Sequence, residues 1–307
     1  MAAESLELKS QLSELKRSLE DLLPGKSYVV DAVLSCILSG GHLLLEDVPG
    51  VGKTTFIKGL TKLLNLEMRR IQFTSDLLPS DILGVQVYDS SNQGFKFHPG
   101  PIFANIVLAD ELNRASPKTQ SALLEAMGER HVSVDLNTMS LPEPFFVIAS
   151  QNPSDHIGTF SIPESQLDRF SIKIQLGYPE PQQEKKIFLE SVLDPLDRVT
   201  QGVIGHTELL NLQGHVDNIA VSAAIVDCLQ SVVDASRKHP DIELGISTRG
   251  GVQWMRLSKA HALVLGRSYV TPEDLLAMAP YCLLHRMIIR HDVPASVLSD
   301  ILNAMEI

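Results

Sequence analysis

The sequence has few cysteines, few aromatic residues and no long uncharged apolar run. Its three cysteines, Cys36, Cys228 and Cys282, lie far apart and match no metal-binding or redox motif. A disulfide framework is therefore not expected, and a reducing cytoplasm is the predicted location. No stretch of about 18 apolar residues is present to form a transmembrane helix. The first residues also lack the charged-then-apolar pattern of a signal peptide.

Basic residues are scarce relative to acidic ones. The chain of 307 residues has 26 Lys and Arg against 37 Asp and Glu, a formal net charge of −11, and its aromatic content is 5%. The short basic clusters have no interleaved aromatic residues that could stack on bases. This balance argues against a general nucleic-acid-binding surface. The ten histidines show no metal-ligand spacing, so no histidine-built metal site is expected.

What the chain does contain is a glycine-rich phosphate-binding pattern, Asp47–Thr54. An apolar run over 42–46 precedes it and indicates a buried strand, and apolar residues recur at helical spacing over 54–64. Strand, glycine-rich turn and helix is the context in which a P-loop binds a nucleoside triphosphate. Gly50 and Gly52 let the backbone approach phosphate oxygens, and the N–H groups of the loop then point at the anion.

Side chains of this loop add charge and a metal ligand. Lys53 can reach the β- and γ-phosphates, and the Thr54 hydroxyl is placed to ligate Mg2+. A lysine in the first turn of a helix opposes the helix dipole, and a bound phosphate resolves that conflict. The alternative is a glycine-rich hairpin with a chance lysine, which the flanking elements disfavour. The predicted ATP-binding residues are Asp47, Val48, Pro49, Gly50, Val51, Gly52, Lys53, Thr54 and Thr55.

A second apolar run, over 106–109, ends in the acidic pair Asp110 and Glu111. Asp110 is suited, with Thr54, to hold the magnesium shell, and Glu111 to polarise the water that attacks the γ-phosphate. A base placed for water predicts hydrolysis rather than transfer to a second metabolite. The alternative is an acidic strand end that caps the following helix, which is less expected downstream of a P-loop.

Three further polar residues are catalytic candidates. Asn152 follows the predicted strand 145–150 and can reach the γ-phosphate or the attacking water, because ligands bind at the carboxyl ends of parallel strands; a simple Asn-Pro turn is the alternative. Arg169 ends a predicted helix and is a candidate arginine finger for a neighbouring subunit, although most such arginines are solvated or paired. Arg249 precedes a helix predicted to start near Gly251, so its guanidinium can face a phosphate.

The predicted fold class is α/β, a P-loop NTPase with a parallel central sheet followed by a smaller all-α domain. Strand-like runs recur at wide intervals with helical stretches between them, at 42–46, 67–74, 106–110, 145–150 and 171–176. Beyond 181 helical patterns dominate, which predicts domains over 1–180 and 181–307. A leucine stripe over 4–23 predicts an N-terminal helix docked on the first domain, and a hairpin insertion is predicted within 130–144.

These motifs resemble those of the MoxR family of AAA+ ATPases, in the clade that includes the magnesium chelatase I subunits. The resemblance runs from about Gly25 to Pro280. Its most specific stretches are Phe73–Asp81, Gly100–Phe103, Asp110–Met127 and Gln166–Phe170. It implies that Asp47–Thr54 is the Walker A motif and that Asp110 and Glu111 form the Walker B motif. It further implies that Asn152 is sensor 1, that Arg169 is the arginine finger and that Arg249 is sensor 2.

The chain departs from the family pattern at a few positions. Thr248 stands where the family usually has proline and Gly250 where it often has alanine, next to the predicted sensor 2. Gly128 replaces a usual glutamate, and Ser150 a usual threonine. The acidic Asp47, in place of the first glycine of a P-loop, is common in the family.

The resemblance implies a cytoplasmic ATPase that uses ATP and Mg2+ and assembles into a homo-oligomeric ring, expected to be a hexamer. It also implies a chaperone or activator that matures partner complexes, with von Willebrand factor A-domain partners and metal or cofactor insertion. The alternatives are a magnesium chelatase I-type motor subunit, a nucleic-acid remodeller, and a scaffold that binds ATP without turnover. Two segments are candidate client or pore contacts, Leu83–His98 and His131–Ser140. The alternative for either segment is a family-typical insert with only a packing role.

Overall fold

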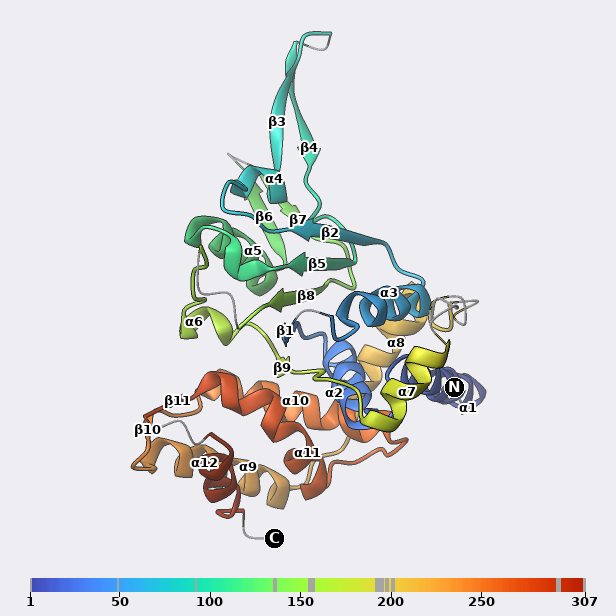
Figure 1. Cartoon of the computed structure of the whole chain (residues 1–307), viewed down its shortest axis with the longest axis vertical. Helices are drawn as coiled ribbons and strands as arrows, with labels where there is room; N and C mark the ends of the chain where they lie inside the picture. Colours follow the sequence, from blue (N-terminus) through green and yellow to red (C-terminus); the bar gives the residue numbers. More distant parts are fainter. Residues whose placement is uncertain are drawn as a thin grey trace.

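The computed structural model describes residues 2–48, 50–91, 93–134, 137–153, 158–190, 196, 199, 202–290 and 294–305. A central sheet occupies the middle of the molecule, a long hairpin projects from one end, and helices from the C-terminal part of the chain gather at the other (Figure 1). None of the described helices is long and apolar enough to cross a membrane.

The central sheet has five strands, and every neighbouring pair in it is parallel. Its spatial order is β2-β5-β8-β1-β9. The strands are β1 (Leu43–Glu46), β2 (Met68–Gln72), β5 (Ile106–Asp110), β8 (Phe146–Gln151) and β9 (Ile172–Ile174). The predicted α/β class and parallel sheet are therefore confirmed. Because all the strands run the same way, their carboxyl ends meet at one edge, where ligands bind in such sheets.

Alternate side chains of each strand enter two different apolar cores, because successive side chains of a strand point to opposite faces. Leu43 and Leu45 join one core, and Leu44 joins the other. The first core also receives α1 (Ala2–Leu22), α2 (Ser27–Leu38) and α3 (Lys53–Leu64). The second receives α4 (Pro79–Leu83) and α5 (Pro117–Glu129). Both faces of the sheet are thus covered by helices, as a parallel sheet requires.

The N-terminal leucine stripe docks on the body of the protein, as predicted. Leu12, Leu15 and Leu19 of α1 are buried in the first core. Lys16 adds an ion pair to Asp31 of α2, with 2.6 Å between Nζ and Oδ1. The stripe is therefore a packing face of the subunit and not a free coiled-coil seam.

Two hairpins extend from the sheet domain. The projecting one pairs β3 (Gly84–Asp89) with β4 (Gly94–Pro99), and the shorter one pairs β6 (His131–Val134) with β7 (Asn137–Ser140). The first hairpin bears exposed apolar side chains, and Phe95 is 75% exposed. Tyr88 packs edge-to-face on Phe95, with 5.5 Å between the ring centroids.

The C-terminal region is helical, as predicted. Its helices are α7 (Pro181–Glu190), α8 (His206–Asp217), α9 (Ala223–Lys238), α10 (Thr248–Val264), α11 (Pro272–Leu283), the 3-10 turn η3 (Leu284–Arg286) and α12 (Pro294–Leu302). It also contains a short antiparallel pair that the sequence did not predict, β10 (Ile242–Leu244) and β11 (Ile288–Ile289). Strands this short carry no readable alternation of apolar and polar residues.

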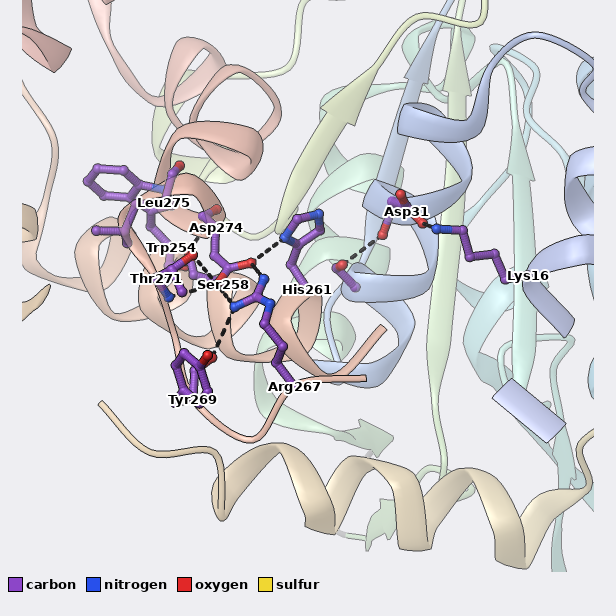
Figure 2. A network of polar contacts seen from close by, with 11 residues as sticks. Lys16, Asp31, Trp254, Ser258, His261, Arg267, Tyr269, Thr271, Asp274 and Leu275 are labelled. Atoms are coloured by element: carbon purple, nitrogen blue, oxygen red, sulfur yellow. Dashed lines mark hydrogen bonds and ion pairs between the residues drawn. The ribbon is translucent and has the colours of Figure 1, made fainter. Parts of the chain in front are cut away.

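A buried carboxylate organises this region (Figure 2). The Asp274 side chain, in the first turn of α11, is 0% exposed. Arg267 Nη1 donates to it across 2.7 Å, His261 Nδ1 lies 2.7 Å away, and the Thr271 N–H donates across 2.8 Å. Burial alone would raise the pKa of Asp274, but the hydrogen bonds from His261 and Arg267 hold the pKa well below its ordinary value. Asp274 therefore stays ionised and joins α10, α11 and the loop between them.

We expect Asp274→Asn to lower the free energy of unfolding by about 3 kcal/mol at pH 7, because it leaves Arg267 without its buried partner. A carboxyl group whose pKa is depressed by folding stabilises the protein above its unfolded pKa of about 4, and this stabilisation is lost as the pH falls below that value. Urea unfolding of both proteins at pH 7, 5 and 3 should show a constant gap at the first two values and a smaller gap at the third. A gap that stays constant or widens at pH 3 would contradict this.

Candidate nucleotide-binding and hydrolysis site

The P-loop connects the carboxyl end of β1 to the start of α3, at the ligand-binding edge of the sheet. Gly50 and Gly52 both have φ of 85°, in the left-handed region that favours glycine. A Cβ at either position would meet nothing within 4 Å, so backbone conformation rather than space requires glycine there. Pro49 lies outside the described residues. Val51 is buried, and Val48 packs against the same core, which leaves the backbone of the loop to meet an anion.

The polar residues of the loop follow at the first turn of α3. Lys53 Nζ reaches back across the loop and donates to the Asp47 carbonyl oxygen across 2.8 Å. Thr54 is exposed and Thr55 is half-buried. A cationic side chain and free first-turn N–H groups at the same helix N-terminus form a phosphate-binding arrangement.

The Asp47 carboxylate is directed away from the loop. It accepts hydrogen bonds from the backbone N–H groups of Leu176 and Gly177, the latter across 3.1 Å, in the segment that leaves β9. Lys26 Nζ donates to the carbonyls of the same segment, including Gly177 across 2.8 Å and Tyr178 across 3.0 Å. Burial lowers the pKa of Lys26, and the nearby Asp47 charge opposes that effect. Asp47 therefore anchors the P-loop to the chain that leads into α7, and only its backbone faces the loop.

Asp110 ends β5 at the same edge of the sheet. Its Oδ1 accepts a hydrogen bond from Ser150 Oγ across 2.5 Å, and its Oδ2 lies 2.6 Å from Arg70 Nη2. An ionised carboxylate has about four lone-pair positions, so two remain for a metal or its water. Among the described residues no cluster of three or more His, Cys, Asp or Glu could hold a metal by itself. This donor set fits Mg2+, which is bound through one or two protein oxygens together with substrate phosphates.

Glu111 follows in a backbone conformation that is rare for its residue type. Its φ is 57°, and such strained residues cluster at functional sites. The Glu111 N–H donates to Ser150 Oγ across 3.0 Å, which fixes the backbone. Its Oε2 accepts from Gln72 Nε2 across 2.9 Å and pairs with Arg114 Nε across 3.2 Å. Arg114 ends the 3-10 turn η1 (Leu112–Arg114), and Gln72 is opposite Asp110 on β2.

Gln72, Arg70 and Ser150 are site residues that the sequence analysis did not assign. Each lies on a strand next to β5 in space but separated from it along the chain, so the contacts depend on the order β2-β5-β8. For Ser150 the available signal was a polar residue at the carboxyl end of the predicted strand 145–150, whereas Arg70 and Gln72 lie inside the predicted strand 67–74, which gave no such signal.

The three remaining candidates lie on different elements. Asn152 directly follows β8, and its carbonyl oxygen accepts from Asn113 Nδ2 across 3.3 Å. Arg169 follows α6 (Glu164–Leu167), and its Nη1 donates to the Leu124 carbonyl of α5 across 2.8 Å. Arg249 is exposed in the first turn of α10, which begins at Thr248 and not near Gly251 as predicted, and its guanidinium bonds to no other described residue. The structure thus joins the Asn152 backbone to η1, the turn that follows the acidic pair, and holds Arg169 on α5.

Comparisons with known proteins agree with this geometry. Residues 42–172 match the model of the ATPase family associated with various cellular activities (AAA), and residues 234–302 match the AAA lid domain. The chain is 39% identical to Chaperone MoxR1 of Mycobacterium tuberculosis, over 97% of this chain and 80% of that protein. It belongs to the MoxR family of AAA+ ATPases.

Two further similar proteins extend the match. The chain is 45% identical to protein YeaC of Bacillus subtilis, over 87% of this chain and 84% of that protein. A crystal structure of a candidate ATPase from Cytophaga hutchinsonii superposes with a TM-score of 0.88 at 33% identity, covering 99% of this chain and 96% of that one. This member of the MoxR family is therefore a nucleotide-binding, ATP-hydrolysing enzyme with a C-terminal lid.

Proposed function

We propose that this MoxR protein is an ATP-driven ring chaperone that remodels or activates a partner protein complex. The observation that supports it most is the arrangement of Glu111 beside Asp110, at the sheet edge that also carries the P-loop. Chaperone MoxR1, its relative, bears the name of that activity. We further propose a cytoplasmic location and a division between the ATPase domain and the lid near residue 180.

In this account Lys53 and the N–H groups of the P-loop bind the phosphates of ATP. Mg2+, held by Thr54 and Asp110, would neutralise phosphate charge when bound. Glu111 accepts a proton from the attacking water, and Asn152 orients that water or the γ-phosphate. Gln72 and Arg114 both contact Glu111 Oε2, so they set the direction in which the carboxylate points.

The site is proposed to be completed by a neighbouring subunit. Arg169 is hydrogen-bonded to α5 of its own subunit. We propose that it acts on the nucleotide of the neighbouring subunit, because an arginine finger is commonly supplied by a second protein chain. A ring, expected to be a hexamer, brings each Arg169 to an adjacent nucleotide. Arg249, exposed at the start of α10, is proposed to contact the nucleotide of its own subunit from the lid.

The β3–β4 hairpin is the proposed contact for the partner. The hairpin projects from one end of the molecule (Figure 1), and it carries exposed apolar side chains, of which Phe95 is the most exposed. Isolated exposed apolar residues are ordinary, but an aromatic pair at a projecting hairpin is suited to protein contact. The proposed partner carries a von Willebrand factor A domain. A chelatase-type motor and a nucleic-acid remodeller remain the alternative functions.

The partner proposal is tested with Glu111→Gln, which should hold the ring in its ATP-bound form, mixed with the von Willebrand factor A-domain proteins of the same organism. We expect a complex in ATP and none in ADP, and Phe95→Ser should weaken it about tenfold. Val226→Ser, at a residue that is 50% exposed on α9, is the matched control and should change nothing. Absence of any ATP-dependent complex, or ATP hydrolysis stimulated by DNA instead, would reject the proposal.

A further inference from the structure

The segment Asp168–Ser171, which contains Arg169, is held by the lid. Arg286 ends η3, and its side chain is 1% exposed. Its Nε donates to Asp168 Oδ1 across 2.8 Å, its Nη2 to the Phe170 carbonyl across 2.6 Å, and its Nη1 to the Ser171 carbonyl across 3.2 Å. One buried guanidinium therefore binds the residues on both sides of Arg169. Charge-assisted hydrogen bonds in a buried site are among the stronger polar contacts.

Arg286 is equally well held on its lid side. It donates to the Cys282 carbonyl of α11 and to Gln253 Oε1 of α10. It also lies against Gly250, where a Cβ would approach Arg286 Cδ to 3.1 Å. Arg249 is the neighbour of Gly250, so a continuous set of contacts joins the start of α10 to the segment that bears Arg169.

The Arg169 side chain itself is held much more lightly. Its guanidinium rests on α5 through the hydrogen bond to the Leu124 carbonyl. It occupies space left by Gly128, where a Cβ would lie 2.1 Å from Arg169 Nη1. The backbone beside Arg169 is thus fixed to the lid by buried bonds, whereas its half-buried side chain is hydrogen-bonded within the described residues only to the Leu124 carbonyl.

We infer that Asp168 and Arg286 are positioning residues for Arg169: through this pair the lid of one subunit sets the position of the arginine finger that acts in the neighbouring site. The inference rests on the proposed function, because it takes Arg169 to act on the next subunit. Neither residue is among those assigned to the nucleotide site. A small displacement of a catalytic group costs a large part of its effect, so loosening the pair lowers hydrolysis at the neighbour and leaves the nucleotide site of its own subunit assembled.

The test mixes two inactive proteins. Lys53→Ala subunits keep Arg169 but have a defective P-loop, and Arg169→Ala subunits keep the P-loop but have no finger. In a randomly assembled ring about a quarter of the interfaces pair an intact P-loop with an intact finger, so the mixture should regain activity. A mixture as inactive as its components would overturn the proposed function, and this inference with it.

Asp168→Ala is then added to one component at a time. On the Lys53→Ala subunits, which supply the finger, we expect the recovered kcat to fall at least about tenfold. On the Arg169→Ala subunits, which supply the P-loop, we expect a change of less than about twofold. Equal losses in the two arrangements would show a merely structural role and would overturn the inference while leaving the shared site intact.

A control ion pair elsewhere in the lid distinguishes the effect of losing a negative charge from the effect of displacing Arg169. Asp217 pairs with Arg256 across 3.5 Å, so Asp217→Ala removes the same charge from another lid arginine. We expect no change from it in either component. Asp168→Asn, which keeps an oxygen acceptor for Arg286 Nε, should recover part of the activity lost in Asp168→Ala; no difference between these two variants would argue against the Arg286 contact.

Discussion

Replacing Glu111 by glutamine should lower kcat for ATP hydrolysis by at least about 100-fold, because the amide cannot accept the proton of the attacking water. ATP affinity should be unchanged, since the P-loop and Asp110 are untouched. The amide keeps the size of the carboxylate, so the contact with Ser150 through the Glu111 backbone is retained. Steady-state phosphate release and equilibrium binding of ATP measure the two quantities separately.

The matched control for this change is Glu67→Gln. Glu67 directly precedes β2, whereas Gln72 is the last residue of that strand, so the two lie at opposite ends of it. Glu67 pairs with Arg69 across 2.8 Å. The Glu67→Gln substitution also removes one negative charge beside the central sheet, and it should leave kcat unchanged. Normal hydrolysis by Glu111→Gln would remove Glu111 from the role of base and favour the alternative of an acid that only orders η1.

Arg169→Ala should lower kcat by about 1000-fold with little change in ATP affinity, because an arginine finger stabilises charge that develops only in the transition state. The variant also loses the hydrogen bond to the Leu124 carbonyl, worth about 1 kcal/mol of stability, so it should fold normally. Hydrolysis and thermal unfolding measured on the same preparation separate the two effects.

Arg237→Ala is a suitable control for Arg169→Ala. Arg237, in the last turn of α9, pairs with Asp234 at 3.9 Å and contacts no residue of the proposed site. Its removal should leave kcat unchanged. If Arg169→Ala hydrolyses ATP at the normal rate, Arg169 is a structural residue of the α5 surface and the finger assignment is wrong.

The P-loop and the acidic pair could be predicted from sequence because each is local. Asp47–Thr54 forms its turn from consecutive residues, and Asp110 and Glu111 are adjacent at one strand end. The Asp47 side chain shows the limit of that reasoning, because its partners Leu176 and Gly177 lie 129 and 130 residues away. A local pattern places a residue in a loop but does not say which way its side chain turns.

The residues that orient the site could not be predicted because they arrive through topology. Gln72 reaches Glu111 only because β2 pairs with β5, and strand order cannot be read from chain order. Arg286 lies 118 residues after Asp168 and reads in the sequence as an ordinary helix-end arginine. The start of α10, in contrast, had a usable signal: Ser247 Oγ accepts from the Gly250 N–H across 2.9 Å, as an N-cap serine does.

The central claim, a hydrolytic site shared between subunits, is tested most directly by the rate of Mg-ATP hydrolysis per subunit over a wide range of protein concentration. The account predicts that the rate per subunit rises with concentration and then levels off, because an isolated subunit lacks the Arg169 of a neighbour. A rate per subunit that is the same at every concentration, down to where the protein is monomeric, would contradict it. The MoxR protein would then hydrolyse ATP with its own residues alone.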